Sequence, residues 1–133
     1  MRVFVDTSAL YALVAASDAD HASVTATLAR LREAKAELLT TNYVSLETLS
    51  LVQRRFGVGA ARALHDDFMP LLKTVWVDAS LHEHGLESLL AANRRDLSLV
   101  DCVSFSAMRR LGLRQVFTVD PHFKEQGFEC LPE

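Results

Sequence analysis

The chain has 133 residues, of which 50% are hydrophobic and 23% charged, and its 14 basic and 17 acidic residues give a net charge of −3. This composition is typical of a globular domain and excludes a disordered or fibrous chain. The acidic balance also excludes nucleic-acid binding by bulk positive charge, so any RNA contact needs local basic residues or a cation.

The sequence predicts a single cytoplasmic domain over residues 1–133, with no contact to a membrane. Its longest apolar run, Ala9 to Ala16, is far shorter than the roughly 20 residues that cross a bilayer. Asp6 interrupts the apolar N-terminal stretch, so we expect no secretory signal. Cys102 and Cys130 lack the spacing of a zinc site, and we expect both thiols to be reduced.

Strands and helices are predicted to alternate along the whole chain. Strands are expected at 3–5, 38–41, 74–77, 116–119 and 128–131. Helices are expected at 9–16, 18–35, 42–55 with Asn42 as its cap, 58–72, 78–93 and 99–111. Parallel strands need crossover helices between them, so this alternation favours a parallel sheet covered on both faces. We predict a three-layer α/β/α sandwich with a central, mainly parallel sheet of four to five strands, and we expect Trp76 in the core.

Four acidic residues fall where such a sheet would bring them together. Asp6 follows the first strand and Asp120 the fourth, while Glu47 and Asp101 lie early in helices. Ligands of open α/β sheets bind beyond the carboxyl ends of the strands. These acids are therefore candidates for one shared site.

Each acid alone also has a purely structural explanation. Asp6 could cap a helix, Asp101 could interact with a helix dipole, Glu47 could be a solvated helix residue, and Asp120 could belong to a turn. Glu47 and Asp101 nevertheless have mostly apolar sequence neighbours. Burying them would be costly, and clustering them would add repulsion. A hard divalent cation such as Mg²⁺, which prefers oxygen ligands, would offset both effects.

Four segments resemble the acidic motifs of PIN domains. They read VFVDTSAL at 3–10, TNYVSLE at 41–47, LVDCVSF at 99–105 and FTVDPHF at 117–123. They occur in the family's order and extend over the whole chain. Among PIN domains, the chain is most similar to the VapC-type toxins of prokaryotic toxin–antitoxin pairs.

The resemblance implies a PIN-like fold and a metal-dependent endoribonuclease that hydrolyses RNA phosphodiester bonds with an activated water. It implies that Asp6, Glu47, Asp101 and Asp120 are the catalytic residues and hold Mg²⁺ or Mn²⁺. It also implies three partners: the RNA substrate, a small antitoxin protein and a second copy of the chain.

Further residues are candidates for substrate binding. By resemblance, Thr7 and Ser8 flank the site, and Asp96 matches another polar position of the family. Arg94 and Arg95 lead into the Asp101 motif, and arginine binds phosphate through its planar fork. A solvated helix end explains this arginine pair equally well.

Two features leave alternatives open. Pro121 stands where many relatives carry a basic or polar residue, which puts the role of Asp120 as a direct ligand in question. His122 lies beside Asp120 and is expected to be structural.

The alternative functions are a catalytically weak PIN-like protein that binds RNA or has a regulatory role, and a phosphatase of another α/β family. A haloacid-dehalogenase-type phosphatase would need a second Asp where this chain has Ser8.

Overall fold

The computed structural model describes residues 1–133 and is built around a five-stranded sheet whose paired strands all run parallel. The strands are β1 (Arg2–Val5), β2 (Glu37–Thr41), β3 (Leu72–Val75), β4 (Gln115–Phe117) and β5 (Glu129–Leu131). Their spatial order is β3-β2-β1-β4-β5. The first strand is therefore central, and residues that follow β1 and β4 lie next to each other. The predicted parallel sheet is confirmed.

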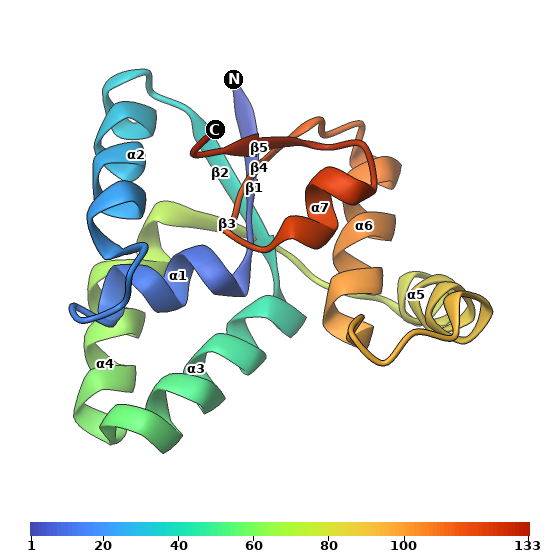
Figure 1. The fold of residues 1–133 in the computed structure, drawn as a ribbon, viewed down its shortest axis with the longest axis horizontal. Coiled ribbons are helices and arrows are strands. Elements are labelled where there is room, and N and C mark those ends of the chain that lie inside the picture. The colour runs from blue at the N-terminus through green and yellow to red at the C-terminus, as the bar shows by residue number, and fades with distance from the viewer.

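Helices cover both faces of this sheet (Figure 1). They are α1 (Thr7–Val14), α2 (His21–Glu33), α3 (Asn42–Phe56), α4 (Val58–Asp67), α5 (Ala79–Ala92), α6 (Leu99–Leu111) and α7 (Pro121–Glu125), with a 3-10 turn, η1, at Met69–Leu71. In Figure 1, α1, α2 and α4 lie on one side, and α5, α6 and α7 on the other. The predicted three-layer sandwich is confirmed, and α3 extends below the carboxyl ends of the strands.

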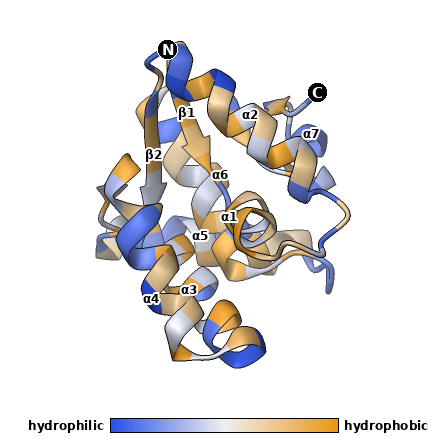
Figure 2. Cartoon of the chain, turned by 90° about the vertical axis from the view of Figure 1, so that its left-hand side faces the viewer, coloured by the Kyte–Doolittle hydropathy of each residue, from blue (hydrophilic) through white to orange (hydrophobic).

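The central strand supplies the middle of the core. Val3, Phe4 and Val5 are at most 1% exposed, because neighbouring strands and helices cover β1 on every side. A strand enclosed in this way is expected to be continuously apolar. Figure 2 shows the contrast: β1 has hydrophobic colour, whereas α2 alternates between hydrophobic and hydrophilic colours.

Several predicted boundaries were wrong by one to five residues, and Trp76 was misplaced. The third strand ends at Val75, so Trp76 lies beyond the last pair of the sheet edge and is 75% exposed rather than in the core. The helix predicted at 58–72 stops at Asp67, because Pro70 limits the chain to the 3-10 turn that follows. Thr41, not Asn42, caps α3, through a hydrogen bond from the Val44 N–H to its Oγ1.

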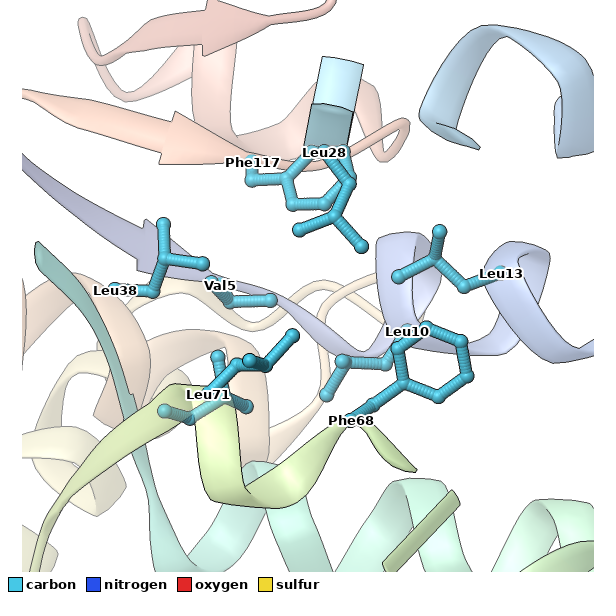
Figure 3. A pocket seen from close by; sticks show the side chains of 9 residues that line it. Val5, Leu10, Leu13, Leu28, Leu38, Phe68, Leu71 and Phe117 are labelled. Atoms are coloured by element: carbon cyan, nitrogen blue, oxygen red, sulfur yellow. The ribbon is translucent and has the colours of Figure 1, made fainter. Parts of the chain in front are cut away.

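One wholly apolar pocket is an interior packing gap. Nine apolar side chains line it, including Leu10, Leu13 and Phe68 (Figure 3), and its volume is about 10 Å³. That is no more than a single water molecule needs, so it is not a ligand site. None of the helices has the length and apolar character that a membrane crossing requires.

Candidate metal centre

Asp6 is fixed at the end of β1 by hydrogen bonds to a single carboxylate oxygen. It caps α1. Its Oδ2 accepts hydrogen bonds from the Ser8 N–H at 3.3 Å, the Ser8 hydroxyl at 2.8 Å and the Thr118 hydroxyl at 2.9 Å. Its Oδ1 has no hydrogen-bond partner within the chain. The carboxylate is thus oriented through one oxygen, and the other is left available.

Burial makes the ionised form of Asp6 unfavourable. The side chain lies in the interior at 2% exposure. The pKa of Asp6 is raised to about 6, above all by this burial; the nearby charges of Asp101 and Asp120 also raise it, while the hydrogen bonds from Ser8 and Thr118 lower it. A cation would remove this electrostatic cost.

Asp101 stabilises the start of its helix through one carboxylate oxygen, and its other carboxylate oxygen makes no hydrogen bond. It is the third residue of α6 and forms a capping box with Ser98: the Ser98 Oγ accepts from the Asp101 N–H at 3.0 Å, and Asp101 Oδ2 accepts from the Ser98 N–H at 3.2 Å. Such reciprocal bonds fix the first turn of a helix. Burial, followed by the charges of Asp120 and Glu47, raises the pKa of Asp101.

Asp120 caps the short helix α7. Its Oδ1 accepts from the His122 N–H at 2.9 Å, and its own N–H donates to the Thr118 hydroxyl at 3.0 Å. Pro121 occupies the first position of α7, where its missing N–H costs nothing. Asp101, Asp120 and His122 each offer one ligand atom, and these three atoms lie within 4.8 Å of one another.

Glu47 approaches the same group from α3. It lies in the second turn of that helix and is half-buried, without a hydrogen-bond partner for its carboxylate. Its charge contributes to the raised pKa of Asp101, which places the two carboxylates within electrostatic reach. The structure therefore brings together acids from four segments that are far apart in the sequence.

The arrangement of free oxygens suits a hard divalent cation. Asp6, Asp101 and Asp120 each use one carboxylate oxygen for hydrogen bonds within the chain and leave the other without one. Glu47 leaves both of its oxygens without such bonds. Mg²⁺ is bound by a few carboxylates while it keeps several waters. These residues fit such an ion by number, charge and donor type.

The residues predicted to bind substrate differ in their surroundings. The Ser8 hydroxyl contacts Asp6, the Thr118 hydroxyl and the Val119 N–H, the last two both at 3.0 Å, so it orients Asp6. Thr7 is buried, and its hydroxyl makes no hydrogen bond. Direct contacts of Thr7 and Ser8 with RNA stay predictions.

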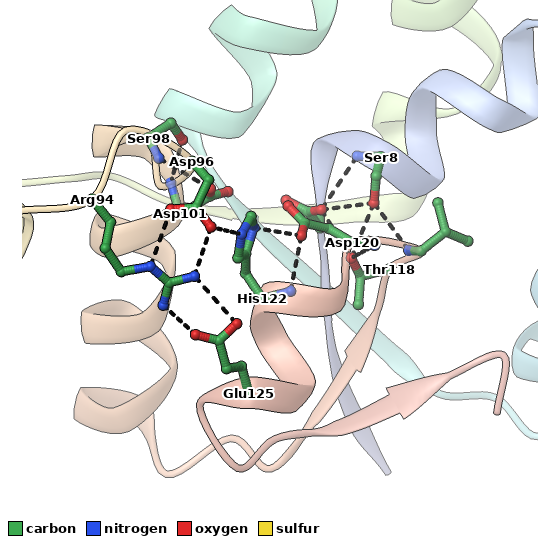
Figure 4. A network of polar contacts seen from close by, with 11 residues as sticks. Ser8, Arg94, Asp96, Ser98, Asp101, Thr118, Asp120, His122 and Glu125 are labelled. Atoms are coloured by element: carbon green, nitrogen blue, oxygen red, sulfur yellow. Dashed lines mark hydrogen bonds and ion pairs between the residues drawn. The ribbon is translucent and has the colours of Figure 1, made fainter. Parts of the chain in front are cut away.

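Arg94 and Asp96 belong to a polar network beside the acids (Figure 4). Arg94 forms ion pairs with Asp96 and Glu125, and His122 contacts both Asp96 and Asp120. The hydrogen bonds from Arg94 and then His122 hold the pKa of Asp96 well below its usual value. Arg95, in contrast, is exposed and has no ion-pair partner, which favours it over Arg94 as a phosphate contact.

Two residues of the site were not identified from the sequence. Thr118 bridges Asp6 and the Asp120 backbone, and its only sequence signal is a position just beyond a strand, next to an acid. Glu125 completes the surroundings of Arg94, and no local pattern indicates this. The structural role expected for His122 agrees with its position between two carboxylates.

Comparison with known proteins identifies relatives over the full length of the chain. The model of the PIN domain family matches residues 3–129. The 23S rRNA-specific endonuclease VapC20 of Mycobacterium tuberculosis is 37% identical over 134 residues, which cover 98% of this chain and 99% of the relative. Its two strain versions, from CDC 1551 / Oshkosh and H37Rv, match equally.

Solved structures agree with this assignment. The crystal structure of M. tuberculosis VapC20, described as a sarcin–ricin loop cleaving toxin, superposes with a TM-score of 0.82 at 34% identity and covers 95% of each chain. VapBC2 of Rickettsia felis, bound to a DNA fragment from its promoter, has a TM-score of 0.73 at 14% identity over 98% and 97% of the two chains, and supports the fold alone. On the family match and the full-length identity, this chain belongs to the PIN domain family.

Proposed function

We propose that this chain is an endoribonuclease that depends on Mg²⁺ or Mn²⁺ and is the toxin of a toxin–antitoxin pair. The observation that carries the proposal is the convergence of Asp6, Glu47, Asp101 and Asp120, each with a carboxylate oxygen free of hydrogen bonds within the chain. The identity with VapC20, a 23S rRNA-specific endonuclease, supports RNA as the substrate.

The residues of the site have separable tasks in this function. Asp6 and Asp101, the two buried acids of the four, would be the principal ligands. Glu47 would bind the ion or orient a water, and Asp120 would complete the cluster. A bound divalent cation lowers the pKa of a water molecule and neutralises charge on the phosphoryl group. Arg95, which is exposed, would bind an RNA phosphate.

The same geometry argues against a metal-free reaction through the ribose 2′-hydroxyl. That route normally uses histidine as acid and base and leaves a 2′,3′-cyclic phosphate. The histidine closest to the acids, His122, has both ring nitrogens in contact with carboxylates. Hydrolysis by water would instead leave a 5′-phosphate and a 3′-hydroxyl, so the end groups of the products separate the two routes.

The other partners also belong to this proposal. Residues 1–133 would act as one domain, pair with a small antitoxin protein and form a homodimer. The toxin–antitoxin assignment rests on the identity with VapC20, whose crystal structure is described as that of a toxin.

The experiment that tests the function is cleavage of 23S rRNA, the substrate of VapC20, by the purified chain. We expect cleavage with Mg²⁺ or Mn²⁺ and none after EDTA. Asp101→Asn should lower the rate by at least about 100-fold, since a direct ligand should matter no less than its outer neighbours do. Asp66→Asn, an exposed acid of α4, is the matched control and should cleave like the wild type. Undiminished cleavage in EDTA would exclude the metal-dependent mechanism.

A further inference from the structure

A chain of polar contacts leads from the segment before α6 to the fourth acid of the site. It consists of Arg94, Asp96 and His122, and it ends on Asp120 (Figure 4). We propose that Arg94, Asp96 and His122 are positioning residues that hold the Asp120 carboxylate in the orientation in which it binds the cation. This inference rests on the proposed metal site.

The first step is the fixation of Asp96 by Arg94. The Arg94 Nε donates to Asp96 Oδ1 at 3.0 Å, and its Nη2 donates to Asp96 Oδ2 at 2.6 Å. This is the bidentate geometry that fixes both position and angle of a carboxylate. Glu125 of α7 holds Arg94 from the other side, with Nη1 and Nη2 as the donors. Arg94 is thus enclosed by two carboxylates, which offset its charge and occupy its donors.

The second step is the fixation of His122 between two acids. Its Nε2 lies 3.1 Å from Asp96 Oδ2, and its Nδ1 lies 2.8 Å from Asp120 Oδ1. Nδ1 is buried, and this close approach to Asp120 is not a hydrogen bond by its angles. The ring is therefore held through Nε2 by Asp96, and its other nitrogen faces the Asp120 carboxylate. Asp120 Oδ1 is held by this contact and by the His122 N–H, which leaves Oδ2 for a ligand.

The topology explains why such a network matters. Asp101 lies on α6, whereas Asp120 caps α7, a helix of only five residues. Arg94 and Asp96 belong to the segment that enters α6. The network therefore connects the segment that enters α6, the helix of Asp101, directly to α7, the helix that Asp120 caps. Carboxylates that bind metals are commonly hydrogen-bonded by outer residues, whose loss lowers metal affinity about 10- to 100-fold.

Adjacent arginines offer a matched test, with Mn²⁺ affinity measured by titration calorimetry on the full chain without RNA. We expect Arg94→Ala to weaken Mn²⁺ binding by about tenfold or more. Arg95→Ala removes an equal side chain without touching the network, so its Mn²⁺ affinity should equal that of the wild type. In RNA cleavage we expect the variants to differ in the opposite way from Mn²⁺ binding. At saturating Mn²⁺, Arg95→Ala should raise the KM for RNA. Glu125→Gln provides a second, milder variant should Arg94→Ala fold poorly.

The outcomes separate this inference from the proposed function. Wild-type protein that binds no Mn²⁺, or binds it as well after Asp6→Asn, would overturn the metal site and the positioning role together. Tight binding by the wild type and equally tight binding by folded Arg94→Ala and Glu125→Gln would overturn the positioning role alone. Circular dichroism establishes that each variant is folded.

A spectroscopic measurement separates positioning from direct ligation by His122. A histidine that acts through Asp120 leaves bound Mn²⁺ with oxygen ligands only. Pulsed electron paramagnetic resonance should then detect no directly bonded ¹⁴N nucleus. A strong ¹⁴N coupling that disappears in His122→Asn would make His122 a ligand and overturn its positioning role.

Discussion

At the scale of single residues, the most consequential feature is an acid buried beneath other acids. Asp6 is interior, and only one of its oxygens is hydrogen-bonded. The native state therefore holds a charge that the unfolded chain would hold at lower cost. Such sites commonly trade stability for function.

The pH dependence of stability follows from the raised pKa of Asp6. In the folded chain this pKa is about 6, against 3.8 for a free side chain. Below pH 3.8 the group is protonated in both states and costs nothing. As the pH rises to 6, the unfolded chain ionises first, so the folded state loses stability, by up to about 3 kcal/mol.

We therefore expect Asp6→Asn to be more stable than the wild type in metal-free buffer at pH 7. This advantage should shrink as the pH falls from 6 to 4. Urea unfolding of both proteins at several pH values measures the difference. Saturating Mn²⁺ should reverse the order, because only the wild type retains the ligand. A constant difference between pH 4 and 7 would contradict the raised pKa.

At the scale of elements, the position of Asp101 depends on the close packing of α5 against α6. Gly85 of α5 lies against Val103 of α6, where an added Cβ would come within 2.4 Å of Val103 Cγ2 and 2.9 Å of Val103 Cα. The backbone Cα cannot move aside without a shift of α6. Since α6 carries Asp101 in its first turn, this contact fixes both the fold and the site.

Gly85→Ala is accordingly predicted to destabilise the protein by about 1–3 kcal/mol, the usual cost of overpacking. The matched control is Gly59→Ala in α4, where an added Cβ would have no atom within 4 Å. This control should be neutral or slightly stabilising, because alanine favours a helix. Differential scanning calorimetry compares the two midpoints. Equal midpoints for Gly85→Ala and the wild type would show that the helices separate easily.

At the scale of the whole molecule, the surface combines a net negative charge with exposed apolar side chains. Leu46, Phe56 and Val58 of α3 and α4 are 67%, 47% and 61% exposed. Exposed apolar side chains can pack against a partner. This agrees with the homodimer that the family resemblance implies.

We expect the purified chain to have a mass near twice 14.8 kDa in light scattering coupled to size exclusion. Homodimers are the commonest closed assemblies of soluble proteins. Dilution over two orders of magnitude tests the stability of the assembly. A mass of one chain at every concentration would refute the proposed dimer.

The sequence by itself determined the parallel α/β architecture and indicated the four acids of the candidate site. Continuous apolar runs such as Val3-Phe4-Val5 mark buried strands, and Asp6, Asp101 and Asp120 stand at local signals of strand ends and helix starts. These signals are local, since capping and strand propensity act within a few residues. Boundaries were less accurate, and the position of Trp76 was wrong, because the end of an edge strand depends on its pairing partner.

Only the tertiary structure decided what each carboxylate oxygen contacts. Thr118 reaches Asp6 across 112 positions, and Arg94 reaches Glu125 across 31. No periodicity encodes such contacts, because they depend on the order of the strands and on the approach of α7 to the start of α6. For the same reason the adjacent arginines Arg94 and Arg95 look equivalent in the sequence, yet one is enclosed by carboxylates and the other is exposed without an ion pair.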